Sequence, residues 1–187
     1  SERPSVLGLT ALRDTIGPAV FVFKQTKRKY PFIKTVMGGS IFSDHLLIGT
    51  PNYEYFLEKT PYIDNFIIGE GQKLFLKLLK KEFPESQKVI TIKDIEGEAL
   101  GFSPLNFPDM SDFNVAEDYP YIAAQASASC PNQCSFCNVF KFWGKYRRRD
   151  VRKVVDEMVK LYETVELNNV NTGHQLFFFT DSLLNPS

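Results

Sequence analysis

The sequence predicts an α/β protein built in two successive parts, and three features of the chain carry this prediction. Apolar strand segments alternate with amphipathic helices as far as Phe83, and the strands end on glycines or other small residues. Such alternation is typical of a doubly wound sheet of parallel strands, whose carboxyl ends share one edge. A stretch rich in proline and aspartate, 102–120, then separates this part from a second strand–helix–strand unit.

The first part is expected to contain three strands, each followed by a helix. We expect the strands at 5–10, 33–39 and 64–71, and the first two helices at 16–30 and 51–59. Thr50 followed by Pro51 supplies an N-cap and a favourable first position for the second helix. The third helix follows the strand that ends in Gly-Glu-Gly, and its apolar side includes Leu74, Leu78 and Leu79.

The segment between the two parts is expected to form a small hairpin and then an ordered linker. Residues 89–94 and 99–102 would be the two arms of the hairpin, around the turn IEGE at 95–98. The linker is the proline-rich stretch 102–120. The predicted domains are therefore 1–86, with a hairpin and linker at 87–120, and a second domain at 121–187.

The second part begins with a strand at 121–126, which leads into a loop that holds all three cysteines. A helix at 150–164, capped by Asp150, and a strand at 176–180 follow. The expected buried stripe of this helix is Val151, Val154, Val155, Met158 and Tyr162. One such unit cannot close a barrel or bury both faces of its strands, so we expect the sequence to be a segment cut at both ends.

Composition excludes several classes of protein. The 22 basic and 22 acidic side chains give a net charge of zero, which does not indicate a nucleic-acid-binding surface. No apolar run approaches the roughly 18–20 residues that cross a bilayer, and the first residues lack the apolar core of a signal peptide. Three cysteines within eight positions suit a shared metal better than disulfides. We therefore expect a protein of the reducing cytoplasm, with no membrane association.

Cys130, Cys134 and Cys137 admit three interpretations. They are unrelated buried thiols, a zinc site, or ligands of an iron–sulfur cluster. The polar residues between them favour an exposed loop over a buried position. A closed zinc site needs a fourth ligand, and neither histidine lies near the cysteines in the sequence. A cubane cluster held by only three thiolates leaves one iron open to bind a substrate.

The spacing Cys-x3-Cys-x2-Cys, with Phe136 before the last cysteine, resembles the CxxxCxΦC signature of the radical S-adenosylmethionine superfamily. The resemblance implies that Cys130, Cys134 and Cys137 hold a 4Fe-4S cluster whose open iron chelates the amino and carboxylate groups of S-adenosylmethionine. It further implies reductive cleavage to methionine and a 5′-deoxyadenosyl radical. The second part would then be the beginning of a partial (β/α) barrel.

The same resemblance suggests further contacts with S-adenosylmethionine. Phe136 occupies the position where the family packs the adenine. Thr180, Asp181 and Ser182 follow the last strand, at the place of the family's Gly-Gly-Glu motif, which holds the methionine amino group. The letters differ here, and a helix cap is an equally good interpretation of Asp181.

The first part resembles a Rossmann-like cobalamin-binding domain. Thr10-x-Leu12, followed by Gly38-Gly39, is similar to the SxL…GG pattern of those domains, with threonine in place of serine. Gly69-Glu70-Gly71 is similar to the GEGE element of cobalamin-binding radical enzymes. Small side chains at adjacent strand ends would leave a slot for the nucleotide tail. The motif DxHxxG, whose histidine would ligate cobalt, does not occur in the chain.

The resemblance to cobalamin-binding-domain radical S-adenosylmethionine proteins therefore covers nearly the whole chain. It implies methyl transfer to an unactivated carbon or phosphorus centre, with ring rearrangement as another chemistry of the subgroup. The substrate, a small molecule or a peptide, is not identified, and a reductant of the flavodoxin or ferredoxin type is implied. Two alternatives stay open: a non-catalytic cobalamin- or nucleotide-binding module with structural cysteines, and a zinc-stabilised interaction domain.

Overall fold

The computed structural model describes residues 4–95, 121–168 and 176–183 of the chain. Within it the chain forms two compact units, Ser1–Ala99 and Leu100–Ser187. Among the described residues, no helix is both long and apolar enough to cross a membrane.

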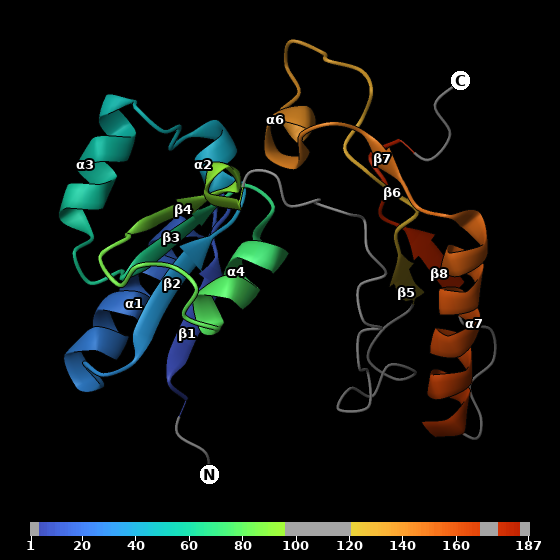
Figure 1. The fold of residues 1–187 in the computed structure, drawn as a ribbon, viewed down its shortest axis with the longest axis horizontal. Helices are drawn as coiled ribbons and strands as arrows, with labels where there is room; N and C mark the ends of the chain where they lie inside the picture. Colours follow the sequence, from blue (N-terminus) through green and yellow to red (C-terminus); the bar gives the residue numbers. More distant parts are fainter. Residues whose placement is uncertain (1–3, 96–120, 169–175, 184–187) are drawn as a thin grey trace. The chain divides into compact units, whose positions relative to one another are not determined.

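Unit 1 is built on a four-stranded parallel sheet (Figure 1). Its strands, in spatial order, are β1 (Val6–Thr10), β2 (Lys34–Gly38), β3 (Asn65–Ile68) and β4 (Val89–Thr91). The first three confirm the predicted strands, with β3 ending three residues early because Gly71 already begins the next helix. All four strands run in one direction, so their carboxyl ends meet at one edge.

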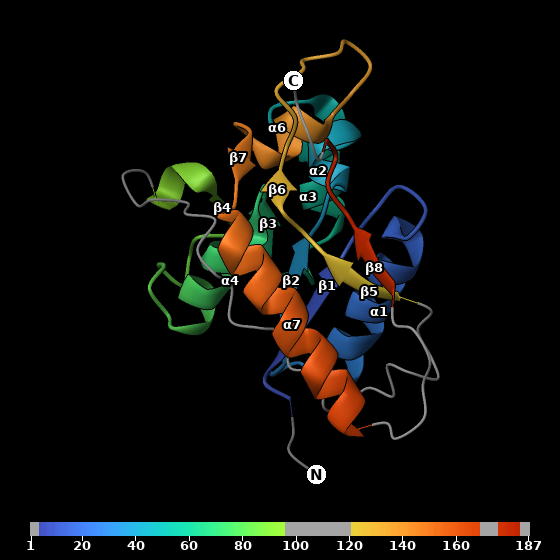
Figure 2. The same cartoon turned by 90° about the vertical axis from the view of Figure 1, so that its right-hand side faces the viewer.

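Helices cover both faces of this sheet. They are α1 (Ile16–Lys29), α2 (Ile41–Asp44), α3 (Pro51–Lys59) and α4 (Gly71–Leu79). Leu7 and Leu9 of β1 pack into the core that contains residues of α1, α2 and α3. Gly8 lies between them and faces the Phe75 ring of α4. Because side chains alternate along a strand, α1 and α4 lie on opposite faces, as Figures 1 and 2 show. The doubly wound prediction is confirmed for this unit.

Aromatic side chains fill the core on the α1 side. Phe23 of α1 and Phe66 of β3 are fully buried. Phe66 makes edge-on contacts with Phe42 and Phe56, with ring centroids 5.8 and 6.0 Å apart. Burying each such ring contributes about 1.5–3 kcal/mol. The predicted cap of α3 is confirmed, since the Thr50 hydroxyl accepts a hydrogen bond from the Tyr53 backbone N–H.

The first arm of the predicted hairpin forms a different structure. Residues 89–91 are β4, a parallel neighbour of β3, and Ile92–Ile95 form a short 3-10 helix. Ile90 is fully buried, so the apolar residues of this segment serve the sheet of unit 1. The second arm and the predicted linker at 102–120 lie outside the described residues. Leu79, expected on the buried side of α4, is 47% exposed, while Leu74 and Leu78 are buried.

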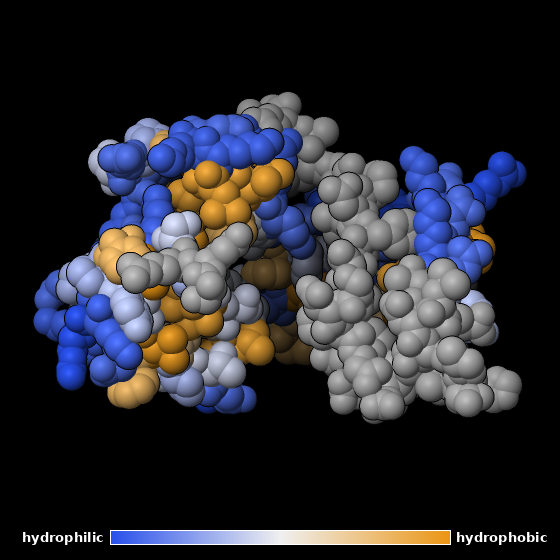
Figure 3. Space-filling model, turned by 90° about the horizontal axis from the view of Figure 1, so that it is seen from below, coloured by the Kyte–Doolittle hydropathy of each residue, from blue (hydrophilic) through white to orange (hydrophobic). Residues whose placement is uncertain are grey.

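An ionic contact joins α1 to the amino-terminal edge of the sheet. The Asp64 carboxylate accepts hydrogen bonds from the Thr35 backbone N–H and from Lys27 Nζ, both at 2.7 Å. Burial alone would raise the pKa of Asp64, but the hydrogen bonds from Lys27 and Thr35 lower it. This edge faces the viewer in Figure 3, where apolar side chains lie among charged ones.

Unit 2 contains one parallel β–α–β unit. Strands β5 (Tyr121–Ala124) and β8 (Leu176–Phe179) pair in parallel. The helix α7 (Val151–Asn168) lies between these two strands in the sequence. Ile122 of β5 and Leu161 of α7 form a small core with Phe177. The predicted strands and helix are confirmed as elements, with α7 ending four residues later than expected.

The predicted buried stripe of α7 needs correction. Val154 is buried, but Val151, Val155 and Tyr162 are 76%, 50% and 39% exposed. Leu161, two turns after Val154, completes the buried side instead. Among the described residues, the helix packs on β5 and β8, which cover a narrower strip than its apolar residues occupy.

Candidate functional site

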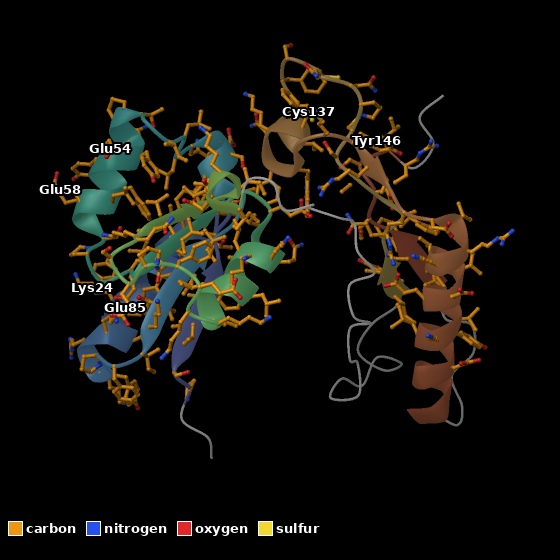
Figure 4. The ribbon with its side chains drawn as sticks, in the orientation of Figure 1. Lys24, Glu54, Glu58, Glu85, Cys137 and Tyr146 are labelled. Atoms are coloured by element: carbon orange, nitrogen blue, oxygen red, sulfur yellow. The ribbon has the colours of Figure 1, made fainter. Side chains whose placement is uncertain are left out.

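The cysteines lie in a loop between β5 and α7 that is closed by a short antiparallel pair. Strands β6 (Ser127–Ala128) and β7 (Arg147–Arg148) pair with each other, and we call these four residues the neck. Between them the chain makes the cysteine segment and a short helix, α6 (Val139–Trp143). Figure 4 shows Cys137 in this loop and Tyr146 beside the neck.

The three thiols are free and accessible. Cys134 is exposed, Cys130 and Cys137 are partly exposed, and none forms a disulfide. The Cys137 backbone N–H donates to the Cys134 carbonyl at 3.0 Å, so these two residues share a tight turn. Within the described ranges, no three His, Cys, Asp or Glu side chains are gathered around a single ion position.

The donor set nevertheless fits a cubane cluster. Each thiolate of such a cluster binds a different iron, so three sulfurs need not converge on one ion. Three free thiols on one loop match that requirement, and no described histidine or further cysteine lies among their neighbours in the sequence. They match a closed tetrahedral zinc site less well, because that site needs a fourth protein ligand.

A hydrogen bond between Ser129 and Gly144 joins the two sides of the loop between the neck and the cysteines. The Ser129 hydroxyl donates to the Gly144 carbonyl at 2.6 Å, and Ser129 is 1% exposed. Ser129 has a φ of 68°, a conformation that costs a residue other than glycine about 1–2 kcal/mol. Gly144, at φ 67° and ψ −142°, lies in a region that is essentially restricted to glycine. The residue before Cys130 is thus held in a definite, unfavourable conformation.

Arg149 fastens the return of the loop to the end of β5. Its backbone N–H donates to the Ala126 carbonyl and its Nη1 to the Gln125 carbonyl, both at 2.8 Å. Its Nη2 pairs with the Glu157 carboxylate of α7. The two side chains are only 10% and 15% exposed, so this ion pair is largely shielded from water. The predicted cap of α7 is confirmed, since Asp150 accepts from two backbone N–H groups of the first turn.

Asp181 connects the end of β8 to the start of the loop. Its carboxylate accepts hydrogen bonds from the Ala126 backbone N–H at 3.0 Å and from the Ser127 hydroxyl. The neighbouring Thr180 donates its backbone N–H to the Ala124 carbonyl at 2.9 Å. The structure therefore brings Asp181 beside the cysteine loop, where it orders the backbone. Its predicted contact with S-adenosylmethionine stays a prediction.

The other residues predicted for S-adenosylmethionine are exposed. Phe136 has 88% of its surface in solvent, the largest fraction for a large apolar residue in the described chain. Thr180 and Ser182 are also exposed. A side chain such as Phe136, which packs on little of the described part of the chain, is available to a ligand.

The residues predicted for cobalamin gather at the carboxyl edge of the unit 1 sheet. Thr10 is the register partner of Gly38, and the Ala11 backbone N–H donates to the Gly38 carbonyl at 2.7 Å. Gly69, Glu70 and Gly71 follow the end of β3 and begin α4. Leu12, 49% exposed, lies in the loop after β1. The structure thus confirms that these residues lie at one edge of the sheet. Their contact with cobalamin stays a prediction.

The fold of unit 1 by itself explains why position 39 is a glycine. Its φ is 114°, and a Cβ there would lie 2.3 Å from the Ala11 carbonyl oxygen. The close approach of two backbone segments therefore requires glycine at this position, whatever the site binds. Gly38 differs, because the nearest atom to its Cβ, the Ile67 carbonyl oxygen, lies 3.4 Å away.

A groove lies at the opposite edge of the same sheet. It has a volume of about 430 Å³, and residues at or before the starts of β2, β3 and β4 line it, including Lys34, Asp64 and Lys88. None of the residues predicted to bind a cofactor lines this groove.

A parallel sheet with small residues at its carboxyl edge, followed by a three-cysteine loop after another parallel strand, agrees with the predicted resemblance to the class of cobalamin-binding radical S-adenosylmethionine proteins. Similarity to known proteins supports this class. The chain is 28% identical to the anaerobic magnesium-protoporphyrin IX monomethyl ester cyclase of Rubrivivax gelatinosus, over 83% of this chain and 31% of the cyclase. It is 25% identical to the cobalamin-dependent radical SAM methyltransferase TokK of Streptomyces tokunonensis, over 84% of this chain and 25% of TokK.

A third relative matches a shorter part of the chain. The cytidylyl-2-hydroxyethylphosphonate methyltransferase of Streptomyces wedmorensis is 30% identical over 44% of this chain and 18% of the relative. No protein-family model matches. The chain spans a third or less of the length of these relatives. The similarities confirm, at low identity, the predicted resemblance to cobalamin-binding radical S-adenosylmethionine proteins.

Sequence reasoning did not find the residues that close the loop. Ser129, Gly144 and Arg149 act through contacts between residues 15 to 24 positions apart. Gly144 directly after a short helix is a usable signal for a special backbone conformation. Arg149 ends the basic stretch 145–149, and its burial against Glu157 is not visible in the sequence.

Proposed function

We propose that this chain is part of a radical S-adenosylmethionine enzyme, with a 4Fe-4S cluster held by Cys130, Cys134 and Cys137. The observation that carries the proposal is a loop with three free thiols, closed at its neck and fastened to the end of a parallel strand. Similarity to TokK over 84% of the chain supports it. When bound, such a cluster supplies the electron that cleaves S-adenosylmethionine to methionine and a 5′-deoxyadenosyl radical.

The chain's own residues would hold and orient the reactants. The three thiolates anchor the cluster, and exposed Phe136 offers an apolar face against which the adenine packs. Asp181, kept beside the loop by Ala126 and Ser127, would direct its remaining acceptor positions to the methionine amino group. The β5–α7–β8 unit would be the beginning of a (β/α) barrel.

Unit 1 would bind cobalamin at the carboxyl edge of its sheet. Open α/β sheets bind ligands at this edge, where strand ends and helix starts leave a crevice. Thr10, Gly38 and the Gly69–Gly71 turn lie there, and their small or absent side chains leave room for a nucleotide tail. We propose methyl transfer as the reaction, because two of the three relatives described above are methyltransferases by name.

Ring formation is the second candidate reaction. Anaerobic magnesium-protoporphyrin IX monomethyl ester cyclases from three organisms match this chain at 26–28% identity over 73–85% of its length. The two reactions share the cluster, S-adenosylmethionine and a reductant, for which we propose a flavodoxin or ferredoxin. They differ in the substrate, and the substrate is a proposal for either reaction.

Anaerobic reconstitution with iron and sulfide tests the proposal. The full protein should turn brown, contain close to four iron and four sulfide per chain, and release 5′-deoxyadenosine from S-adenosylmethionine when reduced with dithionite. A colourless protein that takes up zinc instead would support the zinc-stabilised domain. Cobalamin that binds a protein unable to load iron would support the non-catalytic module.

A further inference from the structure

The conformation of the cysteine loop depends on one side chain beside the first cysteine. Ser129 is buried, precedes Cys130 directly, and donates its hydroxyl to the Gly144 carbonyl at 2.6 Å. Its positive φ is unfavourable for serine, so surrounding contacts must hold it there. The described contact that does so through the side chain is the bond to Gly144.

The bond also lies where it can control the whole cysteine segment. Beyond it, residues 130–137 form few described contacts, the one backbone bond among them joining Cys137 to Cys134. On its other side, the neck and the bonds of Arg149 fix the chain to β5. The Ser129–Gly144 bond is therefore the contact between the two sides of the loop that lies nearest to the cysteines. Ser129 directly precedes Cys130, and Gly144 directly follows α6.

We propose that Ser129 is a positioning residue for the iron–sulfur cluster, acting by clamping the base of the cysteine loop to Gly144. The inference rests on the proposed cluster. A thiolate on a loop with a fixed base is already near its binding position, so less entropy is lost when the cluster binds. Without the hydroxyl, the Cys130 ligand dissociates from its iron more often, and the cluster becomes labile.

Two substitutions separate the hydroxyl from the backbone conformation. Ser129→Ala removes the hydroxyl and keeps the unfavourable φ, whereas Ser129→Gly removes the hydroxyl and relieves it. Ser135→Ala, an exposed serine within the same loop, is the matched control. Far-ultraviolet circular dichroism and the fluorescence of Trp143, the one tryptophan of the chain, verify that each variant folds.

The test measures how fast a chelator removes iron from the anaerobically reconstituted full chain. Loss of one hydrogen bond predicts that both Ser129 variants lose iron about five-fold faster than the wild type and the Ser135→Ala control. The electron paramagnetic resonance signal of the reduced cluster should also broaden in both variants. Wild-type rates in both, or a defect in Ser129→Ala that Ser129→Gly abolishes, would overturn the clamp.

Amide hydrogen exchange without iron separates this inference from the proposed function. The Cys137 and Gly144 backbone N–H groups, which donate to the Cys134 and Phe140 carbonyls, should exchange faster in both Ser129 variants than in the wild type, whether or not a cluster is present. Unchanged exchange would refute the clamp by itself. A wild-type protein that loads no iron would refute the proposed cluster, and with it the positioning role of Ser129.

Discussion

The Arg149–Glu157 ion pair is expected to be the most sensitive electrostatic contact of unit 2. Glu157→Gln removes the negative charge and leaves the side-chain shape almost unchanged. Removing one partner of a buried pair costs about 3–5 kcal/mol, because the remaining charge is left without compensation. The side chains are 10% and 15% exposed, and Arg149 keeps its bond to the Gln125 carbonyl. We therefore expect a loss near the lower limit, about 3 kcal/mol.

Replacing both partners should cost less than the two single substitutions together. In the Arg149→Met/Glu157→Leu variant no unpaired charge is left in the protein, and the new side chains are apolar. The lost bond between Arg149 and the Gln125 carbonyl still costs about 1 kcal/mol. The single substitutions Arg149→Met and Glu157→Leu should each cost about 3 kcal/mol. A double-mutant cycle should therefore give a coupling energy of about 5 kcal/mol between the two side chains.

Urea unfolding followed by tryptophan fluorescence measures these effects on unit 2 directly. Trp143 is the one tryptophan of the chain and lies in α6 of unit 2. Glu163→Gln, the same substitution at an exposed position of α7, is the control and should change stability by under about 0.5 kcal/mol. If Glu157→Gln changes it as little as the control, the pair behaves like an exposed salt bridge and the reasoning is refuted.

Three further predictions concern the cluster, the glycine edge and the acid stability of unit 1. Cys134→Ala should abolish cluster loading; normal iron content would contradict the ligand assignment. Gly39→Ala should destabilise unit 1 by at least about 2 kcal/mol in urea unfolding followed by circular dichroism, because its Cβ meets Ala11; unchanged stability would refute this. The lowered pKa of Asp64 means that its bond to Lys27 stabilises unit 1 above the ordinary carboxyl pKa, and that this contribution is lost as pH falls through the lowered value. Asp64→Asn should therefore reduce the stability of unit 1 at pH 7 and make that stability depend less on pH below about 5. The same dependence on pH in the variant and the wild type would contradict this.

The elements of unit 1 were predictable where local signals and burial agree. Thr50-Pro51 set the start of α3 to the residue, because a cap and a proline act within one turn. Residues 89–95 were misleading, because an apolar run before the turn-like sequence IEGE resembles a hairpin arm. Its actual partner is β3, more than twenty residues away, and local sequence does not encode that pairing.

The candidate site was predictable only in its chemical groups. The spacing of Cys130, Cys134 and Cys137 indicates a shared metal centre, since side-chain chemistry limits what three close thiols can do. The geometry that holds them was not predictable, because the contact between Ser129 and Gly144 joins residues 15 positions apart and depends on the pairing of the neck. The exposed apolar residues of α7, such as Val151 and Val155, show the same limit: periodicity finds apolar stripes but does not say what covers them.

The glycines at the carboxyl edge of unit 1 carry unequal weight as evidence for a cofactor. Gly39 is explained by its contact with Ala11, so its presence does not support cobalamin. Gly69 has a φ of 97°, which favours glycine over other residues. No heavy atom lies within 4 Å of its Cβ position, so there is open space beside it. Gly38 has an ordinary φ, and the nearest atom to its Cβ position is the Ile67 carbonyl oxygen at 3.4 Å, so none of the described residues of unit 1 requires glycine there. If a nucleotide tail passes this edge, Gly38 is the position where a side chain added without strain would meet it.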